Sequence, residues 1–147
     1  MGTTAVATRI ASASLLAIAG LHLNWARGSS WPLPDHEALA DEVAGRPDAD
    51  PPSAAACLAV AGLLGAAAAF VAGHPRGSPG LSRLGAAGVV VTLAGRGGFG
   101  MAGRTDLLSR GSVSERFRAR DRRVYSPLCL ALAALSLPAA LGSPGGA

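Results

Sequence analysis

The chain has 147 residues and a formal net charge of +4, and half of its residues are hydrophobic although only six are Phe, Trp or Tyr. A soluble core of this composition would lack large side chains to fill it, whereas small residues suit helices that pack closely in lipid. All 13 basic residues are arginine, and no recognition module for nucleic acid accompanies them. We therefore expect no nucleic-acid partner. The length suits a single domain over residues 1–147, which we predict to be an integral membrane domain.

Four apolar segments alternate with polar loops. A helix needs about 20 apolar residues to cross the hydrocarbon core of a bilayer, and each segment approaches or reaches that length. We therefore predict an all-α fold, a four-transmembrane-helix bundle. The predicted spans are residues 5–26, 54–72, 81–102 and 126–141.

Small residues lie at regular intervals within these spans. In the second span, Ala61, Gly65 and Ala69 repeat every four residues, which is the spacing expected at a helix contact. In the third span, the glycine run at residues 95–100 is predicted to loosen the helix. That run matches the letters G-x-G-x-x-G, but no βαβ unit surrounds it, so we expect no dinucleotide there.

Two short interfacial helices are predicted in the long loops. In the first loop, Asp35 is placed to cap a helix that Gly45 ends. In the second loop, Ser112 and Glu115 form a capping-box pattern that opens an amphipathic helix. Its apolar side carries Val113, Phe117 and Val124, with arginines around the rest. Such a helix suits an anionic lipid surface.

The distribution of arginine predicts how the spans are oriented. Ten of the 13 arginines lie in the two long loops or at position 96, and three lie near the termini or in the short turn. Positive residues favour the cytoplasmic side. We therefore predict a multi-pass protein of the cell membrane, with both long loops in the cytoplasm and both termini outside.

Two motifs carry a resemblance to a known family. The first is H-x-x-W-A-x-G-x-x-W-P at His22–Pro32, and the second is R-x-x-D-x-x-x-Y-S-P-L-C-L at Arg118–Leu130. Together they resemble the domain-of-unknown-function family 3995 of small bacterial membrane proteins. The likeness covers nearly the whole chain in order and spacing. It implies a four-helix integral membrane protein, and it implies no activity.

The predicted topology brings the chemically versatile residues to one end of the bundle. His22 is three residues from Trp25 and so shares its helix face. A histidine side chain can be neutral or positively charged near neutral pH, so His22 could handle protons. The alternative is a structural hydrogen bond from His22 to a neighbouring helix. The candidate catalytic residues are His22, Asp35 and Asp121, and the candidate substrate-binding residues are Trp25, Trp31, Arg96 and Tyr125.

Arg96 has two interpretations. Its guanidinium either binds an anionic head group or pairs with Asp121, Asp35 or Glu42, because charges inside a membrane are commonly functional and commonly paired. We also expect a hydrogen-bonded cluster drawn from four residues and roofed by Trp31, because an unpaired buried polar group costs about 1–3 kcal/mol. The four are His22, Arg96, Asp121 and Tyr125.

We expect neither a metal nor a cofactor. The three histidines are not predicted to converge, so no metal-ligand spacing is present. Cys57 and Cys129 both fall near the long-loop end, which makes a redox pair conceivable. However, the chain has no C-x-x-C motif, and buried cysteines mostly behave as small apolar side chains.

Two functions remain open from the sequence. In the first, the chain forms a membrane-embedded pocket that binds or processes an apolar, isoprenoid-like small molecule. The analogy is with small integral-membrane terpene cyclases, which poise an acid over an apolar cavity, and it is an analogy of architecture. In the second, the chain is a non-catalytic structural or accessory protein that binds lipid or a protein partner. A cavity reaching His22 would distinguish the two.

Overall fold

The computed structural model describes residues 2–46, 49–105 and 113–142. Every regular element in these ranges is helical, which confirms the predicted all-α fold. The elements are α1 (Thr3–Ala26), α2 (His36–Ala44), α3 (Ala54–Val71), α4 (Pro79–Met101), α5 (Glu115–Arg120), the π-helical stretch η2 (Asp121–Tyr125) and α6 (Ser126–Leu141).

Among the described residues, four helices are long and apolar enough to cross a membrane: α1, α3, α4 and the continuous helix Glu115–Leu141 that joins α5, η2 and α6. By the length and composition of its helices, the chain is a multi-pass membrane protein with a lipid environment. The fourth helix begins earlier than the predicted span at 126–141, because the basic segment continues into α6 without a break. The side of the membrane that each loop faces stays a prediction.

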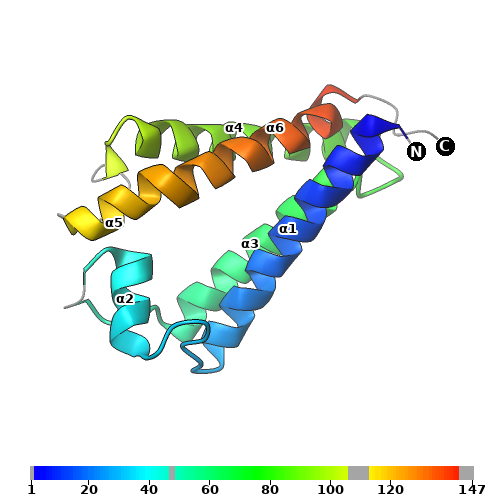
Figure 1. The fold of residues 1–147 in the computed structure, drawn as a ribbon. Helices are drawn as coiled ribbons and strands as arrows, with labels where there is room; N and C mark the ends of the chain where they lie inside the picture. Colours follow the sequence, from blue (N-terminus) through cyan, green and yellow to red (C-terminus); the bar gives the residue numbers. More distant parts are fainter. Residues whose placement is uncertain (1, 47–48, 106–112, 143–147) are drawn as a thin grey trace.

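The long helices form two pairs, α1 with α3 and α4 with α6 (Figure 1). The pairs meet at the end where the two termini lie and diverge toward the end that carries α2 and α5. We call these the closed end and the open end. An apolar core of Ala11, Leu15, Ala68, Val71 and Leu132 joins the pairs. The two long loops therefore lie at the open end, as the bundle topology predicts.

Small side chains face the α1–α3 contact, but not in the predicted register. Ala61 and Ala68 of α3 are buried, whereas Ala69 is exposed. A strict four-residue step drifts by about 40° around a helix of 3.6 residues per turn. Steps that alternate between four and three residues stay on one face of the helix, and the step from Ala61 to Ala68 is of this kind. The prediction that Ala69 lies at the contact was therefore wrong.

Glycines let α4 approach α6 closely. A Cβ atom on Gly97 would lie 2.8 Å from the carbonyl oxygen of Ser126, and one on Gly100 would overlap the hydroxyl of Ser126. The glycine run stays helical as far as Met101. The prediction that this run loosens the helix was therefore wrong, because packing against α6 supports it instead.

The π-helical stretch η2 marks the junction between α5 and α6. Pro127 lies in the first turn of α6, where its ring would crowd the carbonyl group four residues earlier in an α-helix. The wider π turn relieves this crowding. The backbone N–H of Ser126 accordingly donates to the carbonyl oxygen of Asp121, five residues back.

α2 lies at the open end and contacts α5. Asp35 caps α2 as predicted, with its Oδ1 accepting from the Ala38 N–H at 2.8 Å. Gly45 ends α2 at a φ of 73°, and its carbonyl oxygen accepts from the Ser114 N–H at 2.8 Å. A salt bridge joins Arg120 to Glu42.

The start of α5 differs from the prediction. Its cap is Ser114, whose Oγ accepts from the Phe117 N–H at 3.1 Å, and the predicted cap Ser112 lies outside the described residues. Val113 and Phe117 are buried as expected, but Val124 is half exposed. The buried face of this helix continues from Phe117 to Asp121 instead, because residues four apart lie on one face.

Candidate functional site

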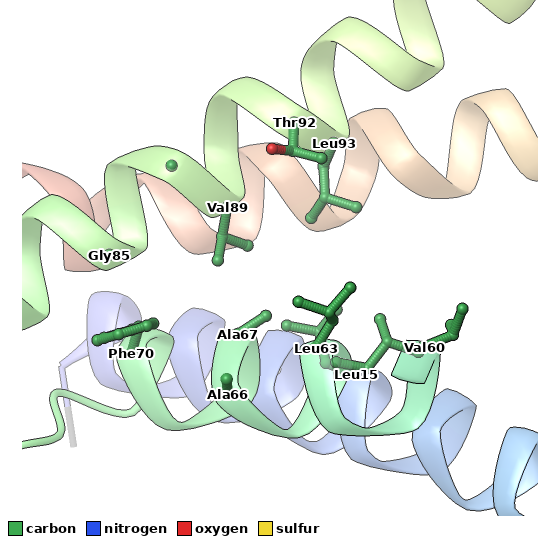
Figure 2. Close-up of a pocket in the computed structure, with 12 residues that line it drawn as sticks. Leu15, Val60, Leu63, Ala66, Ala67, Phe70, Gly85, Val89, Thr92 and Leu93 are labelled. Atoms are coloured by element: carbon green, nitrogen blue, oxygen red, sulfur yellow. The ribbon is translucent and has the colours of Figure 1, made fainter. Parts of the chain in front are cut away.

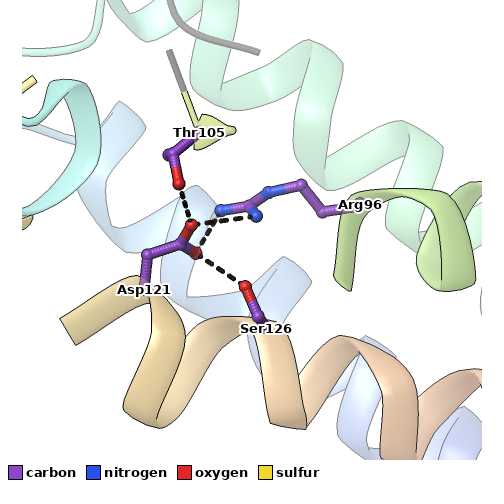
Figure 3. Close-up of polar contacts among 4 residues, drawn as sticks. All are labelled: Arg96, Thr105, Asp121 and Ser126. Carbon is purple, nitrogen blue, oxygen red and sulfur yellow. Dashed lines mark hydrogen bonds and ion pairs between the residues drawn. The ribbon is translucent and has the colours of Figure 1, made fainter. Parts of the chain in front are cut away.

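An ion pair between the partly exposed Arg96 and the buried Asp121 lies at the open end of the α4–α6 pair (Figure 3). Asp121 is fully buried. Arg96 donates from Nη2 to Oδ1 at 2.6 Å and from Nη1 to Oδ2 at 3.4 Å. Thr105 Oγ1 donates to Oδ2 at 2.6 Å, and Ser126 Oγ donates to Oδ1 at 3.2 Å. Both carboxylate oxygens are thus hydrogen-bonded twice, which offsets the cost of burying the charge.

The local fold explains why these groups meet. Arg96 and Gly100 are four residues apart on α4, so they share a face, and a Cβ on Gly100 would lie 2.7 Å from Asp121 Oδ2. Only glycine leaves room for the carboxylate there. Asp121 and Ser126 are five residues apart and would point in different directions in an α-helix, but η2 brings both side chains to one side.

A cavity of about 530 Å³ lies between the two helix pairs beside this ion pair. Its polar lining includes His22, Trp25, Glu42, Arg96 and Tyr125. The rest of its lining consists of Leu15, Ile18, Leu21, Val43, Val60, Leu64, Leu93, Phe117, Leu128, Cys129 and Leu132. We call this space the head cavity. It has the size and the apolar character of a small-molecule site.

His22 lies on the α1 wall of the head cavity. Its Nδ1 lies 2.9 Å from the carbonyl oxygen of Ile18, and because a carbonyl oxygen only accepts, Nδ1 donates this bond. The His22 ring lies 4.8 Å from the Trp25 ring between centroids. The indole N–H of Trp25 donates to the Trp31 carbonyl oxygen at 2.8 Å. His22 therefore has a structural bond, and its Nε2 is the ring nitrogen left for a ligand.

The predicted cluster forms only in part. Contact between Arg96 and Asp121 is confirmed, but within the described ranges the bonds to Asp121 come from Arg96, Thr105 and Ser126, and none comes from His22 or Tyr125. Tyr125 lines the head cavity, with its ring 6.3 Å from that of Phe117 between centroids.

Two predicted site residues lie away from the head cavity. Trp31 is 67% exposed and lines a separate surface pocket beside Asn24, so it does not roof the ion pair. Asp35 serves as the cap of α2 and does not line the head cavity either. The sequence analysis missed Thr105, Ser126 and Gly100. Only the Gly100 position carried a signal, since it lies one helical turn after an intramembrane arginine.

The charged groups that line the head cavity are paired. Arg96 pairs with Asp121, and Glu42 pairs with Arg120. Where the structure describes the chain, no group of three potential metal ligands comes together. Cys129 lines the head cavity, and both it and Cys57 are free thiols. The arrangement therefore offers hydrogen bonds and apolar contact, and it carries no net charge.

The comparison with protein families agrees with these observations. The model of a family described as protein of unknown function, DUF3995, matches residues 15–136. The chain belongs to this family. The match covers both motifs and the chain between them, so it includes His22, Arg96, Asp121 and Tyr125. The comparison with curated proteins found no match, and neither did the comparison with solved structures. Membership in the DUF3995 family thus assigns no activity, which has to be argued from the site.

Proposed function

We propose that this protein binds an apolar, isoprenoid-like small molecule in the head cavity, with an uncharged polar head group beside Arg96. One observation carries the proposal: a cavity of about 530 Å³ in the membrane-spanning region has a mostly apolar lining and a guanidinium on its wall. Apolar surface favours an apolar chain, while a few convergent polar groups orient the ligand.

The pairing of Arg96 decides the type of head group. A guanidinium has five N–H donors, and Arg96 directs two hydrogen bonds to Asp121. Its side chain is 30% exposed, so donors remain on the cavity side. Because Asp121 already neutralises Arg96, a diphosphate would bring excess negative charge into a weakly solvated site. A hydroxyl or carbonyl head group accepts a hydrogen bond from Arg96 without that cost.

The geometry favours binding over cyclisation chemistry. A cyclase of the kind considered above needs an acid that faces the ligand. Asp121 accepts four hydrogen bonds, so we assign it the role of positioning Arg96. Asp35 receives no catalytic role, because it caps α2 away from the cavity. If the protein is an enzyme, His22 is the residue we propose to move a proton, through Nε2.

The alternative is a non-catalytic accessory protein that binds anionic lipid. Four exposed arginines around α5 and η2 favour it: Arg116, Arg118, Arg122 and Arg123. In that function the ligand is held by charge at the membrane surface. Salt would then weaken binding strongly, whereas binding of an uncharged ligand in the head cavity depends little on salt.

The proposal is tested by filling the head cavity. Leu128 and Leu137 are both on α6 and both 43% exposed, but only Leu128 lines the head cavity. We expect Leu128→Trp to weaken binding of geraniol or farnesol in nanodiscs by at least about tenfold, which corresponds to 1.4 kcal/mol. Leu137→Trp should bind like the wild type. Equal affinities in all three proteins would refute the head cavity as the site.

A further inference from the structure

A second apolar space lies between α3 and α4, next to the head cavity (Figure 2). This second space has a volume of about 400 Å³, and we call it the tail groove. Four residues line both spaces: Leu15, Val60, Leu64 and Leu93. The two spaces therefore share walls, and their linings run from Arg96 in the head cavity to Phe70 and Gly85 in the tail groove.

The tail groove has a defined far end. Phe70 projects from α3 toward α4 (Figure 2), and a Cβ on Gly85 would lie 2.3 Å from the Phe70 ring, so that ring rests on the α4 backbone. From Arg96 to Gly85 the rise along α4 is about 16 Å, at 1.5 Å per residue. This length suits an extended chain and exceeds what a compact ligand needs.

The tail groove opens sideways between α3 and α4. Leu63 on one rim is 72% exposed, and Gly88 and Thr92 on the other rim are exposed as well. These residues lie in the middle of spans, where the surroundings are lipid. The end of the head cavity nearest the long loops is flanked by α2, which contributes Glu42 and Val43 to the lining and is tied to α5 by the bridge from Arg120 to Glu42.

We propose that the ligand is a long-chain amphiphile that reaches its site laterally from the bilayer, through the opening between α3 and α4. Its polar head lies beside Arg96, its chain passes Leu64 and Leu93, and its tail ends at Phe70 and Gly85. This inference rests on the proposed function and adds the length of the ligand and its route. Apolar walls along the whole path keep the chain out of water. The head group leaves its lipid surroundings and gains a hydrogen bond from the Arg96 guanidinium.

The test uses a farnesol analogue that carries a diazirine at the end of its chain, with the full-length protein in nanodiscs. After irradiation, mass spectrometry locates the crosslinks. We expect them in the tail groove, on Leu63, Ala66, Ala67 or Phe70, and we expect excess farnesol to suppress them. The matched variants are Gly88→Phe, which fills the tail groove, and Gly62→Phe, which lies on α3 outside it. Both glycines have open space where a Cβ would be added.

Gly88→Phe should reduce tail-groove crosslinking and farnesol affinity at least about tenfold, and Gly62→Phe should leave both unchanged. Thr92→Trp provides a second obstruction on the same rim if Gly88→Phe unfolds the protein. Geraniol, with its shorter chain, should bind Gly88→Phe as it binds the wild type. Crosslinks that are equal in Gly88→Phe and Gly62→Phe would show contact with bulk lipid only and would overturn the inference.

The same experiment separates this inference from the proposed function. If geraniol binding is lost in Leu128→Trp but the farnesol crosslinks lie outside the tail groove, the head cavity stands and the route is wrong. If Leu128→Trp affects neither ligand, both proposals fail. Crosslinking of two copies of the chain through the α3–α4 face would show that a second protomer occupies the tail groove, and it would overturn the route as well.

Discussion

The two helix pairs are held together by different means. In the α1–α3 pair, small apolar side chains such as Ala11 and Ala61 are buried, and a side-chain hydrogen bond from Ser12 to the Ala68 carbonyl oxygen at 3.0 Å joins the two helices. In the α4–α6 pair, glycines bring the backbones together around the ion pair of Arg96 and Asp121. The first contact relies on many weak interactions, and the second concentrates stability in a few polar ones. Single substitutions should therefore harm the second pair far more.

The largest effect is expected from Asp121→Leu. This change leaves the charge of Arg96 unpaired in the membrane-spanning region, and breaking a buried pair costs about 3–5 kcal/mol. The free energy of unfolding, measured by denaturant titration in mixed micelles, should fall by that amount. Glu37→Leu, which removes an exposed acid of α2, is the control and should change little.

A double substitution sharpens this result. Arg96→Met combined with Asp121→Leu removes both charges, so the protein should regain most of the stability lost in Asp121→Leu alone. A double variant as unstable as the single variant would show that packing, and not the charge pair, stabilises the open end of the α4–α6 pair.

The next largest effect is expected from Gly100→Ala. The added methyl group would overlap Ser126 Oγ and push α6 from α4, and overpacking of this kind costs about 1–3 kcal/mol. Gly98→Ala meets open space, so thermal unfolding should separate the two variants clearly. If Gly100→Ala melts like Gly98→Ala, the close approach of the two helices does not matter for stability.

The smallest effect is expected in the α1–α3 pair. Ser12→Ala removes the hydrogen bond to Ala68, and interhelical bonds in membranes contribute about 0.6 kcal/mol on average. Ser14→Ala on the same helix is the control. If Ser12→Ala lowers the free energy of unfolding as much as Asp121→Leu does, the two helix pairs do not differ in how their stability is distributed.

The same difference explains what could be predicted from the sequence. The spans follow from apolar length. An acidic partner for Arg96 follows from the cost of an unpaired charge in lipid, with Asp121 as one of three candidates. Thr105 and Ser126 could not be found this way. Ser126 reaches Asp121 only because Pro127 induces a π turn, so a search for helical faces in steps of three and four residues passes over it. Thr105 lies just past the end of α4, where helical periodicity no longer predicts the direction of a side chain.

The head cavity shows a similar limit. Its volume arises from the angle between two helix pairs, and no local pattern encodes that angle. His22, Trp25, Arg96 and Tyr125 were identified because polar and aromatic residues are rare in these spans. Trp31 and Asp35 share that rarity, yet they belong to the turn and the cap that precede α2. Trp31 and Asp35 were therefore included in the predicted site because they are close in sequence to His22 and Trp25, although they lie outside the head cavity.

Because the helix pairs diverge, a small rotation between them at the closed end produces a large displacement at the open end. α1 has 24 residues, so it is about 36 Å long, and a rotation of about 10° at the closed end moves its far end by about 6 Å. α2 connects the two helix pairs at the open end. Its loops lead to α1 and α3, while Glu42 and Gly45 bind Arg120 and Ser114 of the other pair. This ion pair, this backbone hydrogen bond and the hydrogen bond from Ser114 Oγ to Asp41 Oδ1 at 3.3 Å link α2 to α5 and its cap, and so they hold the spacing of the two helix pairs.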